Sequence, residues 1–171
     1  MAKLYGRNYI GDILSDGQAL PQNTNADSTN MADISGGETN NGLSVFIYAE
    51  SITKGLDDGE TLTINLQTYS SDSAADAEAP FSFANSSGFY GATGTSMHAT
   101  ANTLAADAGV FGITLTAGSA DITWEEGDLI AEIPIPEVMM RLLGHTHVQL
   151  HYITDDAAID MAVTAFVAPR I

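Results

Sequence analysis

Residues 60–69, ETLTINLQTY, decide the fold class of this chain. Leu62, Ile64 and Leu66 alternate with polar residues, so an extended backbone places the three apolar side chains on one face. The opposite face carries threonine, asparagine and glutamine. This alternation predicts a half-buried β-strand, because a helix of the same residues would scatter its apolar side chains around the axis.

The same period of two recurs along the chain, with turn-forming residues such as Lys54–Gly59 between the segments. We expect further strands at 43–50, 110–116, 119–124, 128–135, 146–153 and 159–167. Pro134 and Pro136 predict an edge strand or a strand end for the 128–135 segment, since proline donates no ladder hydrogen bond. Residues 137–143 allow one or two helical turns at most.

Seven or eight short strands with turns between them favour an all-β fold, a jelly-roll-type β-sandwich with long acidic loops. The predicted loops are residues 21–42, 70–79 and 84–109. Trp124 is predicted to fill core. The inward-facing positions of the strands predict a core of Val45, Ile47, Leu62, Ile64, Leu66, Ile113, Leu115, Leu129, Ile133, Val148, Leu150, Ile159, Met161 and Val163.

The length of 171 residues suits a single domain. We expect residues 13–171 to form the sandwich and residues 1–12 to form an N-terminal arm. The start of the chain lacks the apolar segment of a signal peptide. The longest apolar run, residues 45–49, is too short to span a bilayer.

Charge is the most unusual bulk property, with 22 acidic residues against 5 basic ones and a net charge of −17. A surface that binds nucleic acid phosphates or an anionic membrane needs a cationic face, which five dispersed cations do not make. We therefore expect neither nucleic acid nor membrane as a partner. The charge fits a surface that faces solvent or a basic partner, and equally plain solubility. The absence of cysteine excludes disulfides and thiol catalysis.

The most specific candidate for chemistry is a group of three histidines, His145, His147 and His151. In a strand these residues point to one face, where neutral imidazoles could hold a metal ion. Their spacing resembles the first motif of the cupins, a jelly-roll family that includes metalloenzymes. His151 stands where that motif has glutamate, however, and no later histidine supplies the second motif. We expect no tightly held metal, and we expect the histidines to lie on the polar face of an amphipathic strand.

No other catalytic arrangement is evident, so we expect neither enzyme activity nor a cofactor. Adjacent carboxylates, as in Asp57-Asp58, Glu125-Glu126 and Asp155-Asp156, arise by chance among 22 acids. Residues 57–60 lack the calcium-loop pattern, although a weak Ca²⁺ site stays open. No nucleophile elbow occurs.

The N-terminal arm carries the candidate interface residues Lys3, Tyr5, Arg7 and Tyr9. Tyrosine and arginine are typical of interface anchors. Two of the five cations lie in these first residues, so this end of the chain repels an acidic partner least. We expect the arm to contact a neighbouring subunit or another protein, the alternative being a frayed terminus.

The order of elements resembles the small jelly-roll cement, or decoration, proteins of tailed-phage capsids. The segments that carry the resemblance are ILSDGQAL (13–20), LSVFIYAE (43–50), TLTINLQT (61–68), GDLIAEIPIPE (127–137), RLLGHTHVQLHYITDD (141–156) and AVTAFVA (162–168). The resemblance implies a virion protein on the outer capsid surface, a homo-oligomer (dimer or trimer) that bridges major capsid protein subunits without catalysis. The alternatives are a cupin-like jelly-roll metalloenzyme and a carbohydrate-binding or receptor-binding β-sandwich module.

Overall fold

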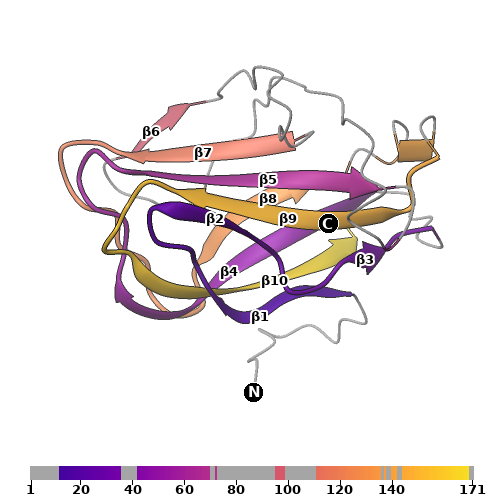
Figure 1. Ribbon diagram of the computed structural model, residues 1–171, viewed down its shortest axis with the longest axis horizontal. Coiled ribbons are helices and arrows are strands. Elements are labelled where there is room, and N and C mark those ends of the chain that lie inside the picture. Colours follow the sequence, from indigo (N-terminus) through magenta and orange to yellow (C-terminus); the bar gives the residue numbers. More distant parts are fainter. Residues whose placement is uncertain are drawn as a thin grey trace.

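The computed structural model describes residues 12–35, 42–69, 72, 95–98, 111–135, 137, 140–141 and 144–169. These residues form two antiparallel sheets that pack face to face as an all-β sandwich (Figure 1). The predicted all-β class is therefore confirmed. Among the described residues, no helix is long and apolar enough to cross a membrane.

The first sheet has four strands in the order β1-β10-β4-β8. They are β1 (Ile13–Ala19), β10 (Asp160–Pro169), β4 (Leu43–Lys54) and β8 (Leu129–Pro134). All neighbours in this sheet are antiparallel. β10, which is late in sequence, thus lies between two strands from the first third of the chain.

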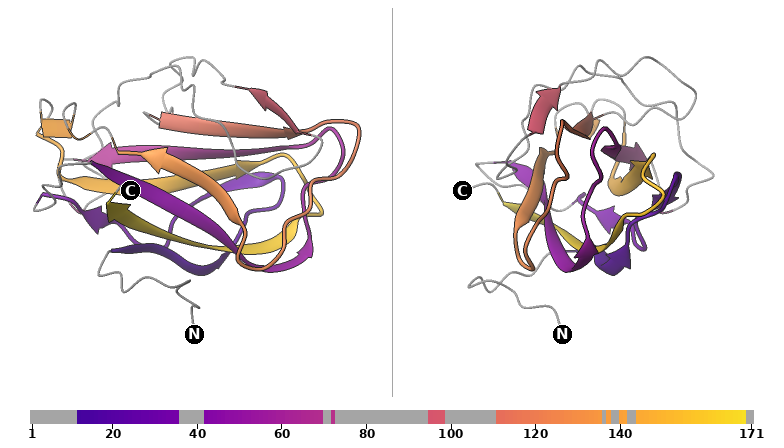
Figure 2. Two further views of the ribbon diagram at one scale, coloured as in Figure 1. Left: turned by 180° about the vertical axis from the view of Figure 1, so that it is seen from behind. Right: turned by 90° about the vertical axis from the view of Figure 1, so that its left-hand side faces the viewer.

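The second sheet has the order β2-β9-β5-β7-β6, and the short β3 pairs with β9 on the same edge as β2. Its strands are β2 (Thr24–Asp27), β3 (Ala32–Asp33), β9 (His147–Thr154), β5 (Thr61–Tyr69), β7 (Phe111–Ala117) and β6 (Thr95–His98). Two ladders of this sheet, β5–β7 and β6–β7, join strands between which no described strand belongs to the first sheet. The two sheets are seen end-on in Figure 2.

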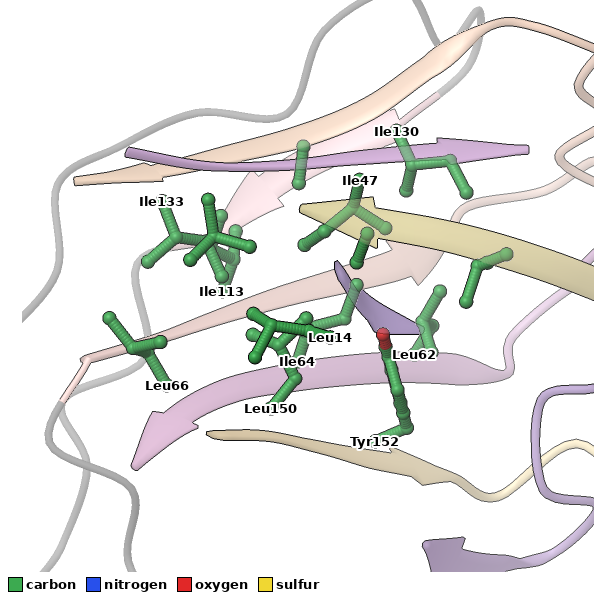
Figure 3. Close-up of a cluster of buried hydrophobic side chains, with 14 of the residues drawn as sticks. Leu14, Ile47, Leu62, Ile64, Leu66, Ile113, Ile130, Ile133, Leu150 and Tyr152 are labelled. Carbon is green, nitrogen blue, oxygen red and sulfur yellow. The ribbon is translucent and has the colours of Figure 1, made fainter. Parts of the chain in front are cut away.

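The core lies between the sheets and consists of the inward-facing side chain of every second strand residue (Figure 3). In β5, Leu62, Ile64 and Leu66 are fully buried, as the alternation predicts. Trp124 also belongs to the core. Every residue of the predicted core is buried except Leu129.

Leu129 is an incorrect core prediction because β8 contains a β-bulge. Ile47 pairs with Ala131, whereas the next residue of β4, Tyr48, pairs with Leu129, so Ile130 is an extra residue. The bulge turns Ile130 into the core, where it is fully buried, and turns Leu129 outward, where it is half-buried. A strict period of two does not anticipate this change of face.

Three other expectations need correction. The predicted loop at 21–42 contains β2 and β3, and the predicted loop at 84–109 contains β6. Residues 119–124 form no strand and contribute a single isolated bridge between Ile122 and Leu56. That bridge requires a glycine at position 55, where a Cβ atom would lie 2.0 Å from the carbonyl oxygen of Ile122. Three residues of the 137–143 segment, Glu137, Met140 and Arg141, are helical, as that segment allowed.

Candidate binding surfaces

The three histidines do not form one cluster. His145 precedes β9 and is buried, with its Nδ1 2.8 Å from the hydroxyl oxygen of Thr68. His147 and His151 lie on β9 and face outward, because the alternate residues Val148, Leu150 and Tyr152 fill the core. The shared face is thus correct for His147 and His151 and wrong for His145, which lies before the strand begins.

The two outward histidines each have an aspartate as cross-strand neighbour. Nδ1 of His151 lies 2.5 Å from Oδ1 of Asp27, its register partner on β2. His147 is the register partner of Asp33 on β3. Hydrogen bonds from Ser35 hold the pKa of Asp33 below its usual value, and the nearby His147 adds to the effect.

The outer face of the second sheet carries a group of polar side chains that we call the polar face: Asp27, Asn65, Gln67, His147, Gln149 and His151. Asn65 and Gln149 are more than nine-tenths buried although they face away from the core. The side-chain amide of Gln149 donates to the carbonyl oxygen of Ser28 at 3.1 Å. Within the described part of the chain, the side-chain oxygens of Asn65 and Gln149 lack a hydrogen-bond partner.

Tyr69 borders the polar face at the end of β5 and donates a hydrogen bond to the side-chain oxygen of Gln67. Burial, together with the negative charge of Asp27, raises the pKa of Tyr69 to about 12. The phenol is therefore neutral at physiological pH. The polar face offers hydrogen-bonding groups, but among the described residues no three His, Asp or Glu side chains come close enough to hold a metal ion.

Acidic residues gather where the turns of several strands meet. The buried carboxylate of Asp156 accepts backbone N–H bonds from Asp57 (2.8 Å), Ala158 (2.6 Å) and Ile159 (3.1 Å). Lys54 forms an ion pair of 2.6 Å with Asp57. Partial burial and the neighbouring Asp155 raise the pKa of Glu60. The carboxylates of this region thus bind backbone amides and close turns, which is a structural use of charge.

The outer face of the first sheet is different, because it carries aromatic and aliphatic side chains. Phe166 stacks on Phe46 with ring centroids 6.1 Å apart, and on Tyr48 with centroids 5.7 Å apart. Ile13 is the register partner of Phe166 and is 44% exposed, and Leu129 is the register partner of Tyr48. These five residues form what we call the aromatic strip, which crosses all four strands.

The aromatic strip was not predicted from the sequence, although the apolar pattern of one strand indicates it. Residues 43–50 are apolar at nearly every position, so their strand has an apolar outer face as well as an apolar inner one. Phe166 likewise occupies an outward position of β10. The predicted interface residues Lys3, Tyr5, Arg7 and Tyr9 lie outside the described residues.

The described residues thus form two contrasting outer faces, one polar and one aromatic. Comparison of the chain with protein-family models, with curated proteins and with solved structures gave no significant match.

Proposed function

We propose that this protein is a virion structural protein, a cement protein that binds the outer surface of a phage capsid and bridges major capsid protein subunits. The observation that carries the proposal is the strand order. The order β1-β10-β4-β8 in one sheet against β2-β9-β5-β7 in the other supports a jelly-roll arrangement, in which β6 would be an addition at one edge. Jelly rolls are frequent in viral capsid proteins, and also in lectins and cupins.

The charge of the chain supports an outward position on the particle. A net charge of −17 opposes contact with packaged DNA but suits a surface that faces solvent. Of the cations in the described part, Lys54 is already paired with Asp57. The partners under this proposal are the major capsid protein and further copies of the chain, as a dimer or trimer.

The N-terminal arm, residues 1–12, provides a second contact in this proposal. Lys3, Tyr5, Arg7 and Tyr9 alternate, so an extended arm presents all four side chains on one face. Tyrosines add contact area at small entropic cost, and the two cations suit the acidic surface of a neighbouring copy. Deletion of residues 2–10 is expected to leave the fold intact and weaken oligomerisation or capsid binding.

The arrangement of the histidines supports a cupin-like metalloenzyme less well than it supports a structural protein. His145 contacts Thr68 in the interior, whereas His151 faces outward and contacts Asp27. Ligands of one metal ion must converge on a point about 2 Å from each ligand atom. The histidines here have different neighbours on different faces.

One observation favours a second candidate, a carbohydrate-binding module. The stacked rings of Phe46, Tyr48 and Phe166 offer an aromatic surface of the kind that lies against sugar rings. A glycan array probed with the purified protein tests this candidate directly. Specific retention of one glycan class, lost in Tyr48→Ala, would support it over the capsid proposal.

The capsid proposal is tested by co-sedimentation. Shells assembled from the major capsid protein encoded in the same genome are mixed with the purified chain and pelleted through a sucrose cushion. We expect saturable binding at a fixed ratio to the capsid subunit. Failure of the full-length chain to bind such shells would overturn the proposed function.

A further inference from the structure

We propose that the aromatic strip is the face by which this protein docks, and that its partner is a protein surface with an apolar centre and a rim of lysine or arginine. The inference rests on the proposed function, in which that surface belongs to the capsid shell. It adds which face of the sandwich makes the contact and what chemistry the partner must present.

The contrast between the two outer faces selects the strip. The polar face consists of amides, histidines and Asp27, which bond to each other and to the backbone. The aromatic strip carries Ile13, Phe46, Tyr48, Leu129 and Phe166 on four neighbouring strands that are joined by backbone ladders. Aromatic residues on rigid elements are the usual anchors of protein interfaces, because burying them releases much water at little entropic cost.

The strip is continuous and already ordered. Ile13, Phe166 and Phe46 are successive cross-strand partners on β1, β10 and β4, and Tyr48 continues the apolar surface to Leu129 on β8. With strands about 4.8 Å apart, four strands span roughly 14 Å. Ring stacking fixes the aromatic side chains before any partner binds, which lowers the entropic cost of docking.

The border of the strip is acidic. Glu50 follows the strip along β4, two residues beyond Tyr48, and its carboxylate accepts a hydrogen bond from the Thr164 hydroxyl. Lys54 lies six residues beyond Tyr48 on β4, roughly 20 Å away at about 3.3 Å per residue. An acidic border selects a basic rim on the partner, because like charges across an interface oppose association.

The same charges argue against the other occupants. A second copy of this chain would bring two molecules of net charge −17 together along acidic borders. A neutral glycan presents no positive charge to the acidic border. A basic-rimmed protein surface satisfies both the apolar centre and the acidic border.

The test compares shell binding of single substitutions on the two outer faces. Phe46→Ser and Phe166→Ser remove rings from the strip, and Ile153→Ser is the matched control, because Ile153 is a partly exposed apolar residue on the outer face of the other sheet. Circular dichroism and thermal melting establish that each variant is folded. We expect each strip variant to weaken shell binding at least tenfold, with the control within twofold of the unsubstituted chain.

A charge variant provides a second readout that does not depend on core packing. Glu50→Lys should lower the association rate with shells, and added salt should narrow the difference in association rate from the unsubstituted chain. If the full-length chain binds shells and both Ser variants of the strip bind equally well, the docking face lies elsewhere while the capsid function stands. Absence of binding by the unsubstituted chain would overturn the function itself.

Two further measurements separate the remaining occupants. If light scattering shows that the strip variants dissociate an oligomer of the isolated protein and shell binding is unchanged, a second copy covers the strip and the proposal is wrong. If deletion of residues 2–10 increases binding of a hydrophobic dye, and Phe46→Ser abolishes the increase, the chain's own arm covers the strip. That outcome would also overturn the proposal.

Discussion

The hydroxyl of Tyr152 on β9, a side chain labelled in Figure 3, lies 2.9 Å from the hydroxyl of Ser15 on β1, so a hydrogen bond joins the two sheets inside the core. The Ser15 hydroxyl donates to the side-chain oxygen of Gln18 at 2.8 Å, so Tyr152 is the donor to Ser15. Gln18 Oε1 also accepts from the backbone N–H of Thr29. The chain of bonds ties β9, β1 and the segment after β2 together.

Substitution of Ser15 is predicted to cost more than substitution of Tyr152. Ser15→Ala leaves the buried Tyr152 hydroxyl without its acceptor and should cost about 1–3 kcal/mol, whereas Tyr152→Phe removes the buried hydroxyl and should cost about 0.5–1.5 kcal/mol. Urea denaturation of both single variants and the double variant forms a cycle. Strict additivity of the two effects would contradict a direct bond.

Burial also raises the pKa of Tyr152 above its ordinary value, which gives a prediction at alkaline pH. The unfolded phenol ionises near pH 10, so its contribution to stability is complete below about pH 10 and is lost as the pH rises toward the folded value. The free energy of unfolding should fall less steeply above pH 10 in Tyr152→Phe than in the unsubstituted chain. Parallel pH curves for the two proteins would contradict this.

The bulge in β8 predicts unequal costs for two adjacent residues. Ile130→Ala should cost about 2–5 kcal/mol, as should Ile64→Ala, because each removes a fully buried side chain. Leu129→Ala should cost less than about 1.5 kcal/mol, since this side chain is half-buried. Chemical denaturation measures all three, and equal costs at positions 129 and 130 would exclude the bulged register.

Asp156 is predicted to be the most sensitive carboxylate in the described part of the chain. Asp156→Ala deprives three backbone N–H groups of a buried charged acceptor and should cost about 3 kcal/mol, with Asp156→Asn intermediate. The exposed Asp160 supplies the control, where Asp160→Ala should change stability by less than about 0.5 kcal/mol. Thermal melting separates these outcomes, and a neutral Asp156→Ala would refute the structural role.

The ionised carboxylate of Glu60 is expected to lower the stability of the fold, in contrast to that of Asp156. Because partial burial and Asp155 raise its folded pKa, its contribution to stability is present below the unfolded value, near pH 4.3, and is lost as the pH rises. Glu60→Gln should therefore melt at a higher temperature than the unsubstituted chain at pH 7, and the difference should vanish as the pH approaches 4. The exposed Glu125→Gln is the control.

The last prediction concerns the metal content of the purified protein. Elemental analysis should find no stoichiometric iron, zinc or manganese, because the side chains of His145, His147 and His151 do not converge on one point. A stoichiometric metal that is lost when His145 and His147 are both replaced would refute the prediction.

The parts of the fold that could be predicted are those where one face of a strand is apolar and the other polar. In β5 this contrast places Leu62, Ile64 and Leu66 correctly in the core. β2, with the sequence TNAD, has no apolar face. It lies at a sheet edge, where backbone hydrogen bonds to β9 hold it without buried side chains. Such a segment has the composition of a loop, so its pairing is determined by the rest of the sandwich.

The candidate surfaces were predicted less well than the core, for a related reason. Strand alternation correctly indicates that His147 and His151 share a face. His145 does not share it, because β9 begins only at His147. The aromatic strip depends on the register that brings Phe166 beside Phe46, and these residues are far apart in sequence. Local patterns carry no information on such a register.

The central position of β10 has a consequence for biosynthesis. On the ribosome, β1 and β4 emerge long before Asp160–Pro169, the strand that must lie between them. Until β10 is made, no backbone hydrogen bonds connect β1 with β4. The apolar side chains of these two strands therefore cannot yet pack into a complete core layer. The nascent chain must therefore postpone assembly of this sheet until β10 is translated, and every premature termination before β10 removes the strand that joins β1 to β4.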